Sequence, residues 1–217
     1  MSSPNARASY SLADRLLIRL HQRASHSHRI ARLIAALAPR IPVGARVLDL
    51  GCGDMTLLAG LSARRRLSRC VGADIWQLRV QPPPGCDYVR TEPGKPLPWT
   101  SRDFDVVLLV DTLHHAEAPE RLLEQALAAG GTVVVKDHLE YGPWSRTLLR
   151  LMDFVGNYGY GVSVPRRYFT HRSFTDLVAR VAPDRRCRMD VGLDLYDHLP
   201  VARSILSPKL HFIAELQ

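Results

Sequence analysis

The chain has 217 residues, of which 46% are hydrophobic and 23% charged, and its formal net charge is +8. This length suits one α/β domain with a sizeable core, so we expect residues 1–217 to form a single domain. No apolar run approaches the roughly 18 residues that a membrane span needs, and the polar N-terminus lacks the apolar core of a secretion signal. We therefore expect a cytoplasmic protein.

Arginine supplies nearly all of the positive charge, because only Lys95, Lys136 and Lys209 are lysines. A basic surface favours nucleic acid, an anionic membrane surface or an acidic carrier protein as a partner. The basic residues come in short groups without interleaved aromatic residues, so nucleic acid is the less favoured of these. The sequence does not indicate the oligomeric state.

The cysteines do not have the spacing of a zinc site, and no Cys-x-x-Cys pair occurs. We expect free thiols in a reducing compartment and no metal site. The four positions are Cys52, Cys70, Cys86 and Cys187.

Two apolar stripes with helical spacing lie in residues 11–38. The residues between them, 24–28, predict a break, and Pro39 ends the second helix. We expect residues 1–40 to form a helical cap whose stripes pack on the core, while a lid, a dimer contact or a membrane contact stays open. The stripes are Leu12, Leu16, Leu17 and Leu20, then Ile30, Leu33, Ile34 and Leu37.

Strand and helix signals alternate from residue 41 to 140, which predicts a doubly wound parallel sheet. Ligands bind such sheets at the carboxyl ends of the strands, so this half is expected to hold the cofactor. Strands are predicted at 46–50, 70–73, 87–89, 104–111 and 132–135, and helices at 57–67 and 119–128. The segments that follow the strands are 51–56, Asp74, 111–115 and 136–138.

Residues 141–217 are predicted to form the substrate side. Helices are expected at 143–155 and 174–181, and strands at 191–196 and 210–216. Aromatic residues on and around the glycine-rich loop 156–161 either wall an acceptor pocket or pack beneath that loop. The candidates for acceptor binding are Tyr141, Trp144, Tyr158 and Tyr160.

The strongest chemical signal is the run Val-Leu-Asp-Leu-Gly-Cys-Gly-Asp at 47–54. Glycines after a strand permit a tight turn and a close approach of backbone to ligand. Thr56 stands where a dinucleotide site has its third glycine, and Asp54 would repel a pyrophosphate. The cationic sulfonium and ammonium of S-adenosylmethionine tolerate such carboxylates, so the turn favours this cofactor over NAD.

This run resembles the glycine-rich motif of class I S-adenosylmethionine-dependent methyltransferases. Residues 97–107 and 110–115 resemble the type 11 subgroup, which is similar to ubiquinone and menaquinone methyltransferases. Residues 136–138, 153–157 and 210–213 are similar to an uncharacterised bacterial branch of it. The resemblance runs from about residue 26 to the end. It implies an α/β, Rossmann-like sheet of seven mostly parallel strands, helices on both faces and a final antiparallel hairpin.

The resemblance also implies roles for individual residues. Asp74 is expected on the ribose, Ile75 against the adenine, and Glu92 is a candidate for the adenine amino group. Met55 replaces a frequent third glycine, which predicts a crowded turn. The methionyl part is expected near Asp49, Gly51, Cys52 and Gly53, and Asp111, Thr112 and His115 are expected to line the cofactor pocket.

Methyl transfer needs a base only when the acceptor must lose a proton. His115, His138 and Asp137 are the candidates, because each is expected near a strand end that faces the cofactor. The alternative is that they line the cofactor pocket or anchor a loop.

The sequence therefore predicts an enzyme that transfers a methyl group from S-adenosylmethionine and releases S-adenosylhomocysteine. We expect the acceptor to be an oxygen or carbon of a small, lipophilic or natural-product-type molecule, free or carrier-bound, by analogy with the subgroup. One alternative is an RNA or protein methyltransferase. Another is an inactive protein that binds the cofactor and serves assembly or regulation.

Overall fold

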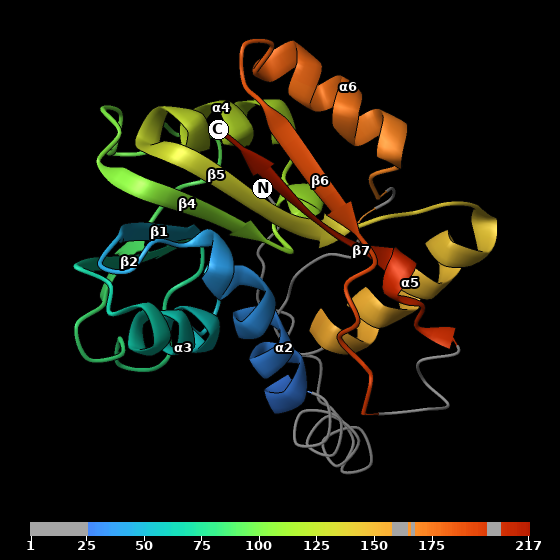
Figure 1. Ribbon diagram of the computed structural model, residues 1–217, viewed down its shortest axis with the longest axis horizontal. Helices are drawn as coiled ribbons and strands as arrows, with labels where there is room; N and C mark the ends of the chain where they lie inside the picture. The colour runs from blue at the N-terminus through green and yellow to red at the C-terminus, as the bar shows by residue number, and fades with distance from the viewer. Residues whose placement is uncertain (1–25, 158–164, 166–167, 199–204) are drawn as a thin grey trace, which may run out of the picture.

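The computed structural model describes residues 26–157, 165, 168–198 and 205–217. Its centre is a seven-stranded sheet in the order β3-β2-β1-β4-β5-β7-β6 (Figure 1). Five neighbouring strands are parallel, while β7 is antiparallel to both β5 and β6. The predicted fold is therefore confirmed. The strands are β1 (Arg46–Leu50), β2 (Arg69–Asp74), β3 (Asp87–Arg90), β4 (Phe104–Val110), β5 (Gly130–His138), β6 (Cys187–Val191) and β7 (His211–Leu216).

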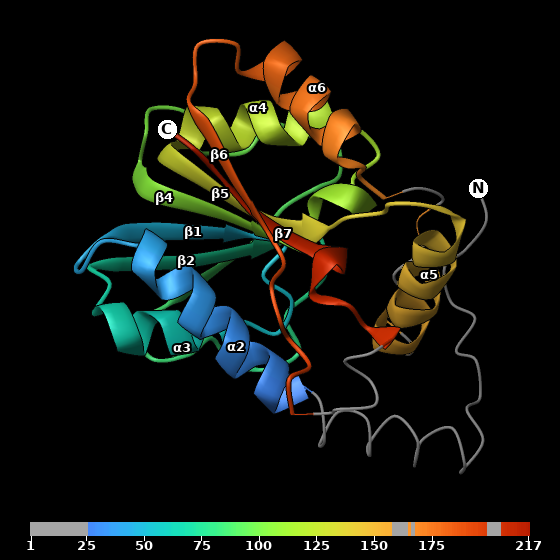
Figure 2. The ribbon, with the colours of Figure 1, turned by 45° about the vertical axis from the view of Figure 1, so that its right-hand side comes forward.

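Helices cover both faces of the sheet, and one stands beyond the carboxyl ends of its strands (Figures 1 and 2). One face carries α2 (Ser27–Leu37), its extension η2 (Ala38–Arg40) and α3 (Thr56–Arg65). The other carries α4 (Pro119–Ala129) and α6 (His171–Val181). Beyond the strand ends lie α5 (Pro143–Asn157) and the short turns η3 (Leu113–His115) and η4 (Pro208–Leu210). None of the described helices combines the length and apolar character that crossing a bilayer requires.

Strand β4 reads as a continuous apolar run because it is covered on both faces. Successive side chains of a strand point in opposite directions. Val106 and Leu108 accordingly pack with α2 and α3, whereas Val107 and Leu109 pack with α4 and α6. The strand thus joins two hydrophobic cores, and its end carries the segment that begins at Asp111.

The second N-terminal stripe packs on the core, as predicted. Leu33 and Leu37 of α2 are fully buried, and Ile34 is half-buried against the same cluster. A Cβ at Gly60 of α3 would lie 2.2 Å from Cδ1 of Ile34, so the missing side chain lets the two helices approach closely. The first stripe, within residues 11–25, lies outside the described residues.

Two predicted strands are wrong in their limits. Strand β5 extends beyond the predicted 132–135 at both ends, and residues 136–138 belong to the strand because they pair with residues 211–213 of β7. Strand β6 occupies 187–191 rather than 191–196, since its partner β7 pairs with those residues. Gly192 then takes a φ of +106°, which ends the strand.

The prediction of four free thiols is also wrong, because Cys70 and Cys86 form a disulfide. Parallel pairing of β2 and β3 matches Val71 with Asp87, so the residues before them are adjacent across the two strands. The sequence spacing conceals this neighbourhood. Cys52 and Cys187 are free.

Candidate active site

The glycine-rich turn joins β1 to α3 and lies against the segment that follows β4. Gly51 has a φ of +79°, and its N–H donates to the Ala73 carbonyl at 2.7 Å. A Cβ on Gly51 would lie 2.2 Å from Oγ1 of Thr112, whereas a Cβ on Gly53 would meet nothing within 4 Å. Gly51 is thus required for the close approach of two loops.

Met55 does crowd the turn, and a second glycine makes room for it. The residue is fully buried and has a φ of 63°, which is unusual for a side chain of this size. A Cβ at Gly72 of β2 would lie 2.9 Å from Cε of Met55 and 2.8 Å from Sγ of Cys52. Gly72 therefore accommodates both side chains beneath the turn.

Asp49, in β1, is a buried carboxylate that lacks a counterion among the described residues. It is 2% exposed, and its Oδ1 has no hydrogen-bond partner in the described part of the chain. Burial, together with the negative charge of Asp74, raises the pKa of Asp49 to about 7. Such a group gains most from a ligand that brings its own positive charge.

Asp74 ends β2 and bridges the turn to the next loop. Its Oδ2 accepts from the Gly53 N–H at 3.0 Å, and its Oδ1 accepts from the Trp76 N–H at 3.1 Å. Ile75 and Trp76 are 42% and 52% exposed, so an apolar surface lies next to this carboxylate. Glu92 is further out, with a side chain 75% exposed and 3.9 Å from Nζ of Lys95.

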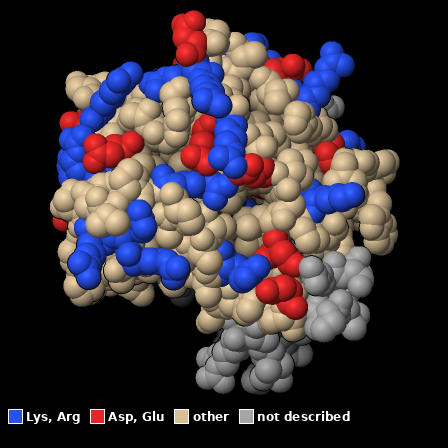
Figure 3. Space-filling model, viewed as in Figure 1, with Lys and Arg blue, Asp and Glu red and all other residues tan. Residues whose placement is uncertain are grey.

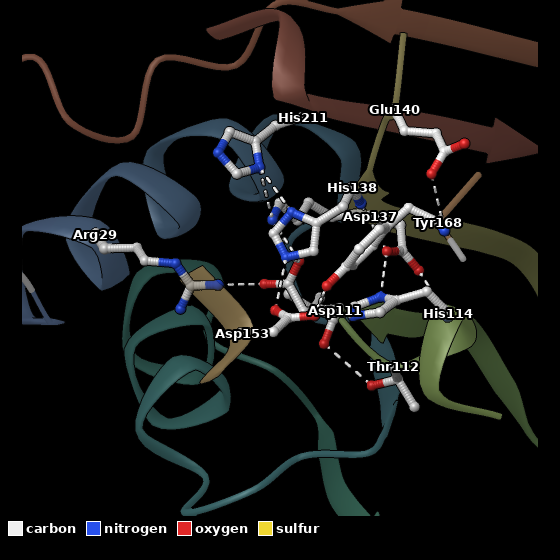
Figure 4. Close-up of polar contacts among 12 residues, drawn as sticks. Arg29, Asp111, Thr112, His114, Asp137, His138, Glu140, Asp153, Tyr168 and His211 are labelled. Atoms are coloured by element: carbon white, nitrogen blue, oxygen red, sulfur yellow. Dashed lines mark hydrogen bonds and ion pairs between the residues drawn. The ribbon is translucent and has the colours of Figure 1, made fainter. Parts of the chain in front are cut away.

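A second group of polar side chains meets at the carboxyl ends of β4 and β5 (Figure 4). Asp111, with a φ of 53°, pairs with Arg29 of α2 and with Lys136, whose side chain is completely buried. Burial alone would raise the pKa of Asp111, but the two cations hold it well below its usual value. Asp111 is therefore charged and ties α2 to the sheet.

His114 lies between two carboxylates in the same group. Its Nδ1 is 2.5 Å from Oδ1 of Asp137, and its Nε2 is 3.3 Å from Oδ2 of Asp153 in α5. The hydroxyl of Tyr168 donates to the same Asp153 oxygen at 2.7 Å. Burial would lower the pKa of His114, but the carboxylates raise it to about 10. At neutral pH His114 is an imidazolium.

His138 and His211 are buried neutral imidazoles beside these charges. Their Nδ1 atoms are 3.2 Å apart, and Nε2 of His138 is 3.6 Å from both Asp111 and Asp153. Burial lowers the pKa of both histidines, and the Lys136 ammonium lowers that of His211 further.

His115 differs from these residues because it is only half-buried. Its ring centroid is 4.0 Å from that of His114. Burial and the neighbouring His114 cation lower its pKa, against the opposite effect of Asp153, Asp137 and Asp111. His115 is therefore an uncharged imidazole at neutral pH that solvent or a ligand can reach.

Other predicted site residues lie further out. Tyr141, which precedes α5, and Trp144, in its first turn, are 55% and 71% exposed. Tyr158 and Tyr160 lie outside the described residues. A cavity of about 510 Å³ between α4 and α6 is lined by His114 and Tyr168 of the polar group, but by none of the predicted cofactor residues.

Sequence reasoning missed several members of the polar group. Arg29 reads as part of a polar helix face, and Tyr168 as one of many aromatic residues. Lys136 offered the clearest signal, because a lysine directly after three valines has no route to solvent if the strand continues. The missed members are Arg29, Lys136, Asp153, Tyr168 and His211.

The family model described as "Methyltransferase domain" matches residues 19–181. The chain belongs to the methyltransferase domain family. It is an enzyme, and the prediction of S-adenosylmethionine as the cofactor of this methyltransferase is confirmed. A search of curated proteins by sequence found no match.

Solved structures share the fold of this methyltransferase at low sequence identity. One is the complex of the Haloferax volcanii Trm112 methyltransferase activator with the putative methyltransferase, with 14% identity, a TM-score of 0.66, and coverage of 94% of this chain and 92% of that chain. Another is an S-adenosylmethionine-dependent methyltransferase from Mesorhizobium loti, with 18% identity and a TM-score of 0.63. The match covers 84% of this chain and 96% of that chain. A third is the plantazolicin methyltransferase BpumL in complex with a monoazolic desmethylPZN analog and SAH, with 15% identity and a TM-score of 0.58. The match covers 94% of this chain and 90% of that chain.

Replacing Gly51 should damage the methyltransferase more than replacing Gly53. Gly53→Ala adds only left-handed backbone strain, about 1–2 kcal/mol. Gly51→Ala adds the same strain and an overlap with Thr112, worth about 1–3 kcal/mol more. Urea unfolding of both variants measures the difference, and Thr112→Ala in the Gly51→Ala background should recover part of it. Equal unfolding midpoints would contradict the contact.

Proposed function

We propose that the enzyme methylates an oxygen or carbon of a small molecule and that His115 is the base that removes the acceptor proton. The observation that supports this proposal is that the accessible, neutral imidazole of His115 lies next to the cationic imidazole of His114, with the ring centroids 4.0 Å apart. A hydroxyl or carbon acid must lose its proton as it is methylated, and a neutral imidazole accepts it. S-adenosylmethionine supplies the electrophilic methyl group when bound.

The structure supports a different role for Asp137. This side chain is completely buried, and its oxygens already accept from the backbone N–H groups of His114 and His138 at 3.2 and 2.6 Å and face Nδ1 of His114. We assign Asp137 to holding His114 in place. His138, 5% exposed and in contact with His211, is assigned to the interior of the same group.

The cofactor residues retain the roles that the resemblance implies, now as proposals supported by geometry. Asp49 would hold the ammonium of the methionyl part beside the backbone of Gly51, Cys52 and Gly53. Asp74 would receive the ribose hydroxyls and Ile75 the adenine. Asp111 and Thr112 border the turn from β4, and the exposed Glu92 remains the proposed partner of the adenine amino group.

We further propose a lipophilic or natural-product-type acceptor, free or carrier-bound. The exposed aromatic side chains of Tyr141 and Trp144 beyond the strand ends support it. The neighbour BpumL was solved with an azole-containing analog, which fits the same class. The net charge of +8 would favour an acidic carrier or an anionic membrane surface.

An RNA acceptor is the second candidate, favoured by the same net charge. On the face shown in Figure 3, however, the basic side chains stand in separate groups among acidic ones. RNA binding usually needs a continuous basic surface. Salt-dependent retention of an RNA duplex or hairpin would support this candidate, and no retention at low salt would dismiss it.

Removing the charge of Asp49 should stabilise the ligand-free enzyme and weaken cofactor binding. Because the folded pKa is about 7, the unfolded state ionises first, and the free energy of unfolding falls as pH rises from about 4 to 7. Asp49→Asn removes that fall, so at pH 8 it should be more stable than wild type by about 2–4 kcal/mol. Calorimetric titration should show much weaker binding of S-adenosylmethionine.

Asp54→Asn is the matched control for this experiment. Asp54 is an exposed carboxylate of the same turn, and asparagine can keep its contact with the Thr56 N–H. We expect little change in stability or affinity. If Asp49→Asn behaves like this control, the assignment of Asp49 fails.

His115→Gln should lower kcat/KM for the methyl acceptor by about 10²–10⁴-fold. Formation of S-adenosylhomocysteine from a panel of a phenol, an alcohol, a carbon acid and an amine measures it. His114→Gln should shift the acidic limb of the pH–rate profile upward, because losing the neighbouring cation raises the pKa of His115.

His171→Gln, on the exposed start of α6, provides the control and should leave both measurements unchanged. Turnover of the amine alone, with no loss in His115→Gln, would contradict the proposed chemistry.

A further inference from the structure

A cluster of two histidines and an aspartate lies apart from the residues assigned to methyl transfer. His28 is in the first turn of α2, while Asp197 and His198 belong to the connection between β6 and β7, which passes beside that turn (Figure 2). Nε2 of His28 is 2.7 Å from Oδ1 of Asp197, and the rings of His28 and His198 are 3.8 Å apart. One nitrogen or oxygen from each residue lies within 4.8 Å of the other two.

We propose that His28, Asp197 and His198 bind a divalent transition-metal ion such as Zn²⁺. Two imidazoles and one carboxylate are a ligand set that zinc accepts, with water completing a tetrahedron. With metal–ligand distances of about 2.0–2.2 Å, donors around such an ion are about 3.4 Å apart. Donor atoms that already lie within 4.8 Å reach this spacing by side-chain rotation.

The surroundings of the cluster orient its carboxylate. Nη2 of Arg32 lies 3.6 Å from Oδ2 of Asp197, the oxygen that does not contact His28. The same guanidinium donates through Nε to the carbonyl of Asp194 at 3.2 Å. Arg32, one turn after His28 in α2, thus holds the connection between β6 and β7 against the helix. Its contact with Oδ2 leaves Oδ1 of Asp197 directed at His28.

A second trio of similar spacing, His114, His115 and Asp153, is a weaker candidate. Both ring nitrogens of His114 already face the carboxylates of Asp137 and Asp153. A metal ion would have to displace one of them from a buried position. At the cluster on α2 the ion would replace the contact between His28 and Asp197, whose side chains are 36% and 34% exposed, so no carboxylate has to be displaced from a buried position.

Because of the position of the site, a bound ion would have a structural effect in addition to the methyl-transfer chemistry. His28 is followed by Arg29, which pairs with Asp111 beside the cofactor turn. An ion shared by α2 and the β6–β7 connection would hold both segments together at this edge. Metal binding would therefore stabilise the placement of Arg29, and the enzyme would unfold at a higher temperature with the metal than without it.

The test uses the full chain after removal of metal with a chelator. Calorimetry with Zn²⁺ and visible absorption with Co²⁺ should show one tightly bound ion, and Zn²⁺ should raise the melting temperature. His28→Ala and His198→Ala should each weaken binding at least 10-fold and abolish the melting shift. The milder variant Asp197→Asn should act in the same direction, and circular dichroism checks that each variant is folded.

Two histidine variants serve as matched controls. His26→Ala removes a neighbouring histidine at the start of α2, and His115→Ala disrupts the alternative trio. Both should bind Zn²⁺ like wild type. Absence of binding to wild type, equal binding by folded His28→Ala and His198→Ala, or loss confined to His115→Ala would overturn the proposal.

Discussion

The arrangement of this methyltransferase depends on a buried group of paired charges at the carboxyl ends of β4 and β5. Isolated charges are costly to bury, and leaving one without its partner costs about 3–5 kcal/mol. The members therefore fix the positions of α2, η3, β5, α5 and the segment after β4 relative to one another. Three cations face three carboxylates among the described residues: Arg29, Lys136 and His114, with Asp111, Asp137 and Asp153.

The β1 side of the sheet, where we propose that the cofactor binds, has the opposite electrostatic character. The charges beside β4 and β5 are compensated within the protein, whereas Asp49 in β1 is buried without a counterion among the described residues. A cationic cofactor bound next to Asp49, as we propose, would supply the missing positive charge and lower the cost of burying this carboxylate. Thr112, in contact with Gly51, places the two sides next to each other. The methyl donor is thereby expected close to His115.

Much of the fold follows from local patterns in the sequence. The run 46–54 predicts a strand, a turn and a helix because its apolar residues and glycines act within a few positions of each other. The polar group was only partly predictable, since Arg29, Asp111 and Asp153 are separated by 82 and 42 positions and meet through tertiary pairing. The wrong limits predicted for β5 and β6 also result from tertiary pairing, because the pairing of each strand with β7 determines which of its residues are in the sheet. The disulfide likewise depends on the register of β2 and β3.

The most direct test of this account is the protonation state of His114, followed by nuclear magnetic resonance of its ring in labelled protein and assigned by comparison with His114→Gln. The account predicts an imidazolium throughout the neutral range, with a pKa of about 10, because its two ring nitrogens lie next to the carboxylates of Asp137 and Asp153. A ring that instead loses its proton near the ordinary histidine value of about 6.5 would contradict the buried charge pairing on which the proposed role of His115 rests.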